Sequence, residues 1–121
     1  MSNSSYLTAL KYLCSSLGLE HCTQDWAIIV ADSRRIDEFI CFYENHTELT
    51  QWSRRLLFEL IVASVSDGLD LKALSIAQLK IYGDFVKSNA DKYPAEFNYW
   101  SSLIREDDLF TIGEWLKKIY K

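Results

Sequence analysis

The residue types most often found at metal and nucleophile sites are two histidines, His21 and His46, and the cysteines Cys22 and Cys41. Grouped together, they could form a zinc site or a thiol activated by an imidazole. Their spacing matches no recognised zinc pattern, and a structural zinc site needs four well-placed ligands. Nothing in the sequence places a base or an orienting group beside either thiol, as nucleophilic catalysis requires. We therefore expect neither a metal nor another cofactor.

The three cysteines, Cys14, Cys22 and Cys41, are an odd number without CxxC spacing. Such usage is typical of free thiols in a reducing cytoplasm, and we interpret all three as small, partly buried apolar residues. The N-terminal residues have neither the basic nor the apolar region of a signal peptide, and no transmembrane segment is evident. The sequence therefore predicts a cytoplasmic protein that is not held in a membrane.

Glu59 is the one charged residue in the apolar stretch Leu56–Val65. A carboxylate in such surroundings could be a general acid or base with a raised pKa. Alternatively, it could form an ion pair with Arg55, four residues earlier on the same helix face, or simply reach solvent. We favour a structural role, because the chain has no phosphate-binding glycine loop, no paired metalloprotease histidines and no nucleophile elbow. The sequence predicts that the protein is not an enzyme.

Acidic side chains are the remaining candidates for a functional site. The net charge is −4, and the whole excess of acidic residues lies in the first 51 residues, which contain seven acidic and three basic residues. Nucleic-acid binding needs a basic surface, and none is evident; a negative surface instead attracts a basic partner. Our candidate partner-binding residues are Asp37, Glu38, Glu44, Glu48, Glu106, Asp107 and Asp108.

The first four of these acids lie on or just after one predicted helix. Asp37, Glu44 and Glu48 are seven and four residues apart, so they would line one side of a continuous helix. This surface is either an ordinary solvated face or a docking site in which charge speeds encounter and selects the partner. Tyr43 and Trp100, if partly exposed, would be aromatic anchors for such an interface.

The elements that position these residues are expected to be helices packed around Leu56–Val65. This stretch is apolar on nearly every side, as in a core helix, and it is too short for a membrane span of about 20 residues. One proline and four glycines among 121 residues are too few for a turn-rich β-sandwich. The sequence predicts a single all-α domain over residues 1–121, a compact bundle of six or seven helices.

Capping and turn residues predict where these helices begin and end. We expect a first helix from about Ser5 to Leu17, closed by Gly18, and a short helix capped by Thr23. Asp32 or Ser33 caps the third helix, Thr50 caps the central helix to about Ser66, and Asp67-Gly68 ends it. Residues 69–74 form either a short turn of helix or a bridge, after which Ser75 caps the next helix. Tyr93-Pro94 breaks that helix, and Glu106-Asp107-Asp108 opens the last.

Three segments in the second half of the chain resemble a known family. They are Arg55 to Leu69 (RLLFELIVASVSDGL), Asn98-Tyr99-Trp100 and Asp108 to Gly113 (DLFTIG). The pattern is similar to that of small bacterial immunity proteins of contact-dependent growth inhibition and related polymorphic toxin systems. The resemblance implies a cytoplasmic, non-enzymatic inhibitor that binds the C-terminal domain of a toxin delivered by a sibling cell. Many of those toxins are nucleases with basic clefts, which an acidic surface would suit.

Contact residues cannot be transferred from this family position by position, because its members diverge most where they meet their partners. The acidic candidates named above therefore rest on charge and spacing alone. A second hypothesis is a small helical regulator, antitoxin or adaptor that binds another cellular protein. An enzyme that uses Glu59 or a Cys–His pair is a third.

Overall fold

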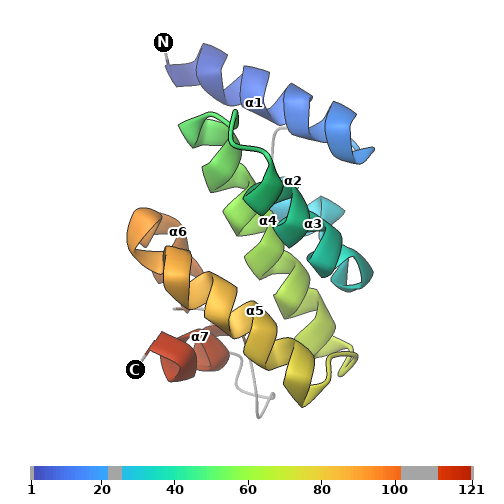
Figure 1. Cartoon of the computed structure of the whole chain (residues 1–121), viewed down its shortest axis with the longest axis vertical. Coiled ribbons are helices and arrows are strands. Elements are labelled where there is room, and N and C mark those ends of the chain that lie inside the picture. Colours follow the sequence, from blue (N-terminus) through green and yellow to red (C-terminus); the bar gives the residue numbers. More distant parts are fainter. Residues whose placement is uncertain (1, 22–25, 102–111, 121) are drawn as a thin grey trace.

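The fold is all-α, as the sequence predicts. A computed structural model describes residues 2–21, 26–101 and 112–120, and no strand occurs among them (Figure 1). The helices are α1 (Ser2–Leu17), α2 (Trp26–Val30), α3 (Ile36–Asn45), α4 (Gln51–Asp70), α5 (Ile76–Asn89), α6 (Pro94–Ser101) and α7 (Ile112–Tyr120), with short 3-10 helices η1 (Ser33–Arg35) and η2 (Ala90–Lys92).

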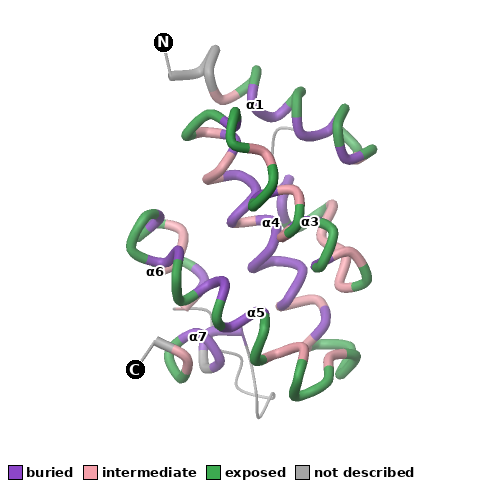
Figure 2. Tube along the Cα trace, in the orientation of Figure 1, coloured by how far each residue is buried: buried purple, intermediate pink, exposed green. Residues whose placement is uncertain are grey.

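Helix α4 is the centre of the bundle and contacts each of the other six α-helices. Every residue of Leu56–Val65 except Glu59 is buried, which confirms the prediction of a core helix. Figure 2 shows this burial along the middle of α4, whereas the exposed residues concentrate on the outer turns of the surrounding helices. None of the described helices combines the length and apolarity that crossing a bilayer requires.

Three predicted helix ends are confirmed by their hydrogen bonds. The Thr50 side chain accepts from the Ser53 backbone N–H at 3.1 Å and caps α4. Ser75 caps α5 in a capping box, in which the Gln78 side chain accepts from the Ser75 N–H at 2.8 Å. Gly18 closes α1 with a φ of 66°, a left-handed conformation that glycine adopts without strain.

The predicted end of the central helix at Asp67-Gly68 is wrong, because α4 continues through both residues to Asp70. Gly68 instead allows close packing: a Cβ atom there would lie 2.6 Å from Leu74 Cγ. Asp67 accepts a hydrogen bond from the Ser33 backbone N–H at 3.3 Å, and so joins η1 to the C-terminal part of α4. Asp67 and Gly68 therefore make tertiary contacts within a continuing helix and do not form a turn.

The elements around α4 differ from the prediction mainly in detail. Asp32 caps the 3-10 helix η1, which leads directly into α3, by accepting from the Arg34 N–H at 2.9 Å. Helix α6 begins at Pro94, as expected, and the short η2 precedes it. The predicted cap at Thr23 and the predicted start of the last helix at residues 106–108 lie outside the described residues.

Candidate functional site

An open groove separates α3 from α5, and one of the predicted partner-binding acids, Glu44, is among the residues that line it. The groove has a volume of about 320 Å³. Its lining residues come from these two helices alone: Ile40, Glu44, Ile81, Asp84, Phe85, Ser88 and Asn89. We call it the α3–α5 groove. Three of these residues are apolar, Ile40, Ile81 and Phe85, and none of the described residues that line the groove is basic.

Three carboxylates are here called the groove acids: Glu44 and Asp84, which line the groove, and Asp37, which lies on α3 seven residues before Glu44. Asp37 and Glu44 are seven residues apart on α3, so helical periodicity places them on the same side, with Asp84 opposite on α5. All three are exposed. Asp37 reaches α5, where burial raises the pKa of the Tyr82 hydroxyl and a hydrogen bond to Asp37 raises it further. Acidic side chains on both helices beside apolar ones are suited to binding a basic surface.

Buried hydrogen bonds beneath the groove hold α3 and α5 together. The Tyr43 hydroxyl donates to Asn89 Oδ1 at 3.1 Å and lies 2.6 Å from the Tyr93 hydroxyl. The Tyr43 ring also packs edge-on against Phe85, with the ring centroids 5.2 Å apart. Tyr43 is therefore buried, so the exposure on which its role as an aromatic anchor depended is absent. The same is true of Trp100, which is only 5% exposed.

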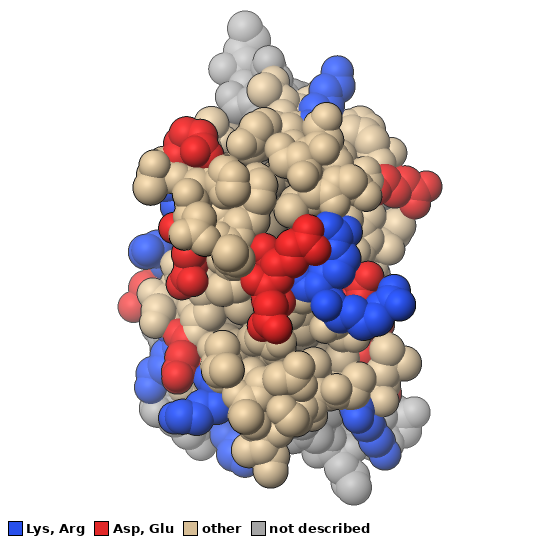
Figure 3. Space-filling view, turned by 45° about the vertical axis from the view of Figure 1, so that its right-hand side comes forward, with Lys and Arg blue, Asp and Glu red and all other residues tan. Residues whose placement is uncertain are grey.

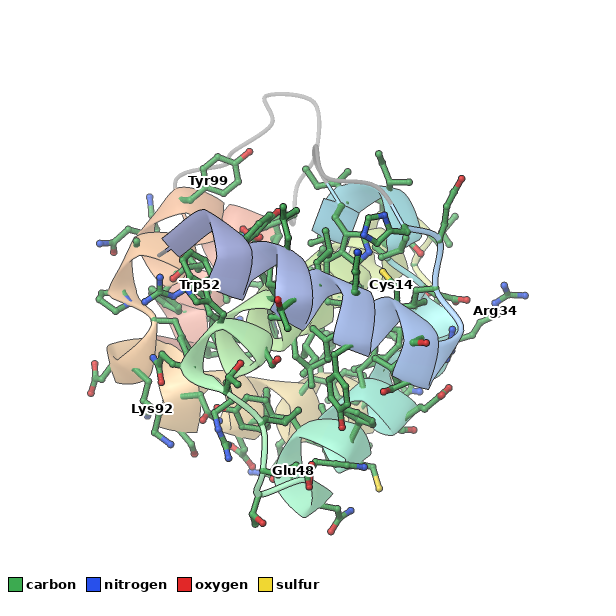
Figure 4. The ribbon with its side chains drawn as sticks, turned by 90° about the horizontal axis from the view of Figure 1, so that it is seen from above. Cys14, Arg34, Glu48, Trp52, Lys92 and Tyr99 are labelled. Carbon is green, nitrogen blue, oxygen red and sulfur yellow. The ribbon has the colours of Figure 1, made fainter. Side chains whose placement is uncertain are left out.

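The other predicted acids do not join the groove. Glu38 points away from it and forms an ion pair with Arg35 at 2.7 Å, and this hydrogen-bonded guanidinium lowers the pKa of Glu38. Glu48 lies in the connection between α3 and α4, at the edge of a different hollow lined by Tyr12 and Trp52 (Figure 4). Glu106, Asp107 and Asp108 lie outside the described residues.

The face that carries α3 is also less uniformly acidic than the sequence suggests. Figure 3 shows acidic side chains spread over it, with basic side chains directly beside the central acidic group. Arg34 pairs with Asp32 at 3.1 Å, and Arg35 pairs with Glu38. Asp32 and Glu38 are therefore paired with arginines, whereas none of the groove acids forms an ion pair with a described residue.

Glu59 is half-buried and does not pair with Arg55. The Arg55 guanidinium lies over the Trp52 ring, 4.9 Å from its centroid, and its Nε is 3.8 Å from Glu96 Oε2, which is too long for a hydrogen bond. Glu59 Oε2 instead accepts from the Trp100 indole N–H at 3.3 Å. Burial raises the pKa of Glu59, with a further increase from the charge of Glu96.

The cysteines and histidines are not gathered into a site within the part of the chain that the structure describes. No group of three potential metal ligands occurs there. Cys14 is buried, as expected, whereas Cys41 is exposed on α3, and Cys22 lies outside the described residues. His46 stacks on the Phe42 ring at 3.9 Å between ring centroids and contributes to packing.

Asp84 is a site residue that the sequence reasoning missed. It was overlooked because the second half of the chain has balanced charge, so a single acid on α5 did not stand out. Ile81 and Asp84 are three residues apart on one helix face, but a single exposed apolar side chain is common on protein surfaces and does not identify an interface.

Comparison of the chain with protein-family models, with curated proteins and with solved structures found no significant match in any of the three.

Proposed function

We propose that this protein is an immunity protein that binds and neutralises the toxin domain of a contact-dependent growth inhibition system, without catalysing a reaction. The observation that carries the proposal is the α3–α5 groove, with acids from both helices, apolar side chains and no basic residue among the described residues that line it. The similarity of Arg55–Leu69 and two later segments to such immunity proteins supplies the identity of the partner.

Charge favours a basic partner. Asp37, Glu44 and Asp84 lie on two helices and face solvent, so their fields add over the groove mouth. Such a surface raises the association rate of a positively charged protein and disfavours an acidic one. A nuclease domain is a suitable partner, because its substrate cleft must itself be positive to bind phosphates.

The apolar side chains of the groove support a protein partner in preference to a simple counterion. Ile81 is 60% exposed, and Ile40 and Phe85 lie beside it in the groove. Burying such side chains contributes about 25 cal/mol for each Å² of apolar surface removed from water. The apolar side chains of the groove can therefore contribute binding energy, while the acidic side chains at its edges select a basic partner. Stable protein interfaces share this arrangement of an apolar centre and a polar rim.

The groove is also held in shape before a partner arrives. Tyr43 joins α3 to Asn89 of α5 by a buried hydrogen bond, and its ring packs on Phe85. A preformed site loses less conformational entropy on binding. Tight inhibition by a small protein depends on such preorganisation.

Growth rescue tests the proposal. The proposal predicts that a toxin gene lies directly upstream, and the C-terminal domain it encodes is expressed in susceptible cells, alone or with the chain. The wild-type chain should restore growth, and Glu44→Lys and Asp84→Lys should protect less. Glu20→Lys, which makes the same charge change at an exposed site outside the groove, should protect fully.

Two outcomes would count against the proposal. If the folded wild-type chain neither binds that domain nor restores growth, an antitoxin, regulator or adaptor that acts on another cellular protein takes its place. If the chain protects but Glu44→Lys, Asp84→Lys and Glu20→Lys behave alike, the immunity function stands and the assignment of the groove is wrong.

A further inference from the structure

A second pocket, between α1, α2, α4 and α6, surrounds the carboxylate of Glu59. We call it the Glu59 pocket. It has a volume of about 310 Å³ and is lined by Tyr6, Trp26, Ala27, Ile28, Leu56, Glu59, Tyr99 and Trp100. It shares no lining residue with the α3–α5 groove. Four of its eight lining residues are aromatic, and one is acidic.

The carboxylate in this pocket has no cationic partner among the described residues. Its one hydrogen bond comes from the Trp100 indole, which is neutral. Arg55, the nearest arginine in sequence, is directed to Trp52 and Glu96. The Glu96 carboxylate adds negative charge nearby, because it raises the pKa of Glu59. A half-buried acid with no counterion among the described residues makes the pocket attractive to a cation.

The walls of the pocket favour a planar organic cation over a metal ion. The faces of tryptophan and tyrosine rings attract cations, and a guanidinium both stacks on such rings and binds a carboxylate through two parallel hydrogen bonds. A metal ion prefers several oxygen ligands, and no group of three potential ligands occurs in the described chain.

The mouth of the pocket suits the aliphatic stem of a long side chain. Ile28 is 52% exposed and Tyr99 is 51% exposed, so both are accessible to a ligand that enters. Figure 4 shows Tyr99 projecting from the outer edge of the molecule, near the end of α1 that lies over Trp52. A volume of about 310 Å³ is at the lower end of the range for small-molecule pockets and is sufficient for one side chain.

We propose that the Glu59 pocket binds the guanidinium group of an arginine side chain on a partner protein. Glu59 accepts two hydrogen bonds from the guanidinium, while the exposed Tyr99 contacts its face and Ile28 contacts its stem. The inference goes beyond the proposed function and does not depend on which protein supplies the arginine. The described residues that line the pocket differ from those that line the groove. An experiment that disproves binding at one site therefore leaves the proposal for the other site standing.

Titration of the isolated chain with a capped arginine, Nα-acetyl-arginine amide, tests this proposal. The readout is the indole N–H signals in a two-dimensional ¹⁵N–¹H NMR spectrum. Trp26 and Trp100 line the pocket and should shift in a saturable way. Trp115 is buried in α7 outside the pocket and serves as the internal control.

A charge-removing variant makes the result specific to Glu59. Glu59→Gln keeps an acceptor for the Trp100 indole but removes the charge, so it should weaken binding about tenfold or more. Glu44→Gln removes one exposed carboxyl outside the pocket and should leave the affinity unchanged. Equal affinity of wild type and Glu59→Gln would overturn the proposal, as would shifts of Trp26 and Trp100 only at concentrations that also shift Trp115.

Two further ligands test the source and type of the cation. Guanidinium ion lacks the side-chain stem and should bind more weakly than the capped arginine, and Nα-acetyl-lysine amide lacks the planar fork and should also bind more weakly. Guanidinium ion that binds as tightly as the capped arginine would overturn the assignment to a protein side chain. Capped lysine that binds as tightly would overturn the assignment to guanidinium.

Discussion

The Tyr43 hydroxyl donates a hydrogen bond to Asn89 Oδ1 at 3.1 Å, and so joins α3 to α5 below the groove that separates them. Both side chains are buried, and Asn89 also donates to the Phe85 carbonyl at 2.8 Å. The distance between the acids of the two helices is therefore fixed by the core. This relationship connects the stability of the bundle with the geometry of its candidate binding surface.

Removing the Tyr43 hydroxyl should destabilise the protein. Tyr43→Phe keeps the ring contact with Phe85 but leaves the buried partners Asn89 and Tyr93 with fewer hydrogen bonds. We expect the free energy of unfolding in urea to fall by about 1–3 kcal/mol. Tyr12→Phe, at a tyrosine that is 41% exposed, is the matched control and should change it by less than about 0.5 kcal/mol. Equal effects of the two variants would contradict this account.

A methyl group at Gly68 should clash with Leu74. The Cβ of Gly68→Ala would lie 2.6 Å from Leu74 Cγ, so we expect a loss of about 1–3 kcal/mol from overpacking. In a Leu74→Ala background the clash is absent, and the same change should instead stabilise α4 by up to about 1 kcal/mol, because alanine favours helix over glycine. A double-mutant cycle in urea measures this reversal. An equal effect of Gly68→Ala in both backgrounds would show that the contact does not limit packing.

Glu59→Gln should be more stable than wild type near neutral pH. Because burial raises the pKa of Glu59, the folded protein holds this proton more tightly than the unfolded chain does. The contribution of Glu59 to stability is therefore fully present below the unfolded pKa of about 4.3, and it is lost as the pH rises through the folded pKa. Urea unfolding at several pH values should show an advantage of the variant that shrinks toward pH 4. An advantage that grows on acidification would contradict the assigned direction.

Arg35 should matter for stability more than its neighbour Arg34. The Arg35 Nη2 donates to the Leu17 carbonyl at the end of α1 at 2.7 Å, and its guanidinium lies over Phe39. Arg35→Ala should therefore cost about 1–2 kcal/mol in thermal or urea unfolding. Arg34 is 88% exposed, so Arg34→Ala should cost less than about 0.5 kcal/mol. If Arg34→Ala were the more destabilising variant, the proposed tie between η1 and α1 would be wrong.

The helices and the core could be predicted because their causes are local. Thr50 and Ser75 cap helices with side chains that act within three residues, and the apolar stretch Leu56–Val65 can be buried only by neighbouring helices. The end of α4 was mispredicted for the opposite reason. Gly68 meets Leu74, and Asp67 binds the backbone of Ser33, and neither contact can be read from turn propensity.

The candidate site was harder to predict, because it depends on which helices meet. Spacing on one helix could group Asp37 with Glu44, but it could not bring Asp84 opposite them or bury Tyr43 against Asn89. Sequence proximity also suggested an Arg55–Glu59 pair, whereas Arg55 lies over Trp52 and Glu59 bonds to Trp100. In each of these cases, contacts between residues that are distant in sequence determine which partner the side chain binds.

The most direct test of the central claim is the association rate of this chain with the proposed partner, a toxin domain encoded by a neighbouring gene, measured by stopped-flow fluorescence over a range of salt concentrations. The account predicts that Asp37→Lys, Glu44→Lys and Asp84→Lys each slow association and flatten its dependence on salt, because the groove acids steer a basic partner. Glu20→Lys has the same net charge and should behave like wild type. Association rates and salt dependences that are the same for the three groove variants and for Glu20→Lys would contradict the claim.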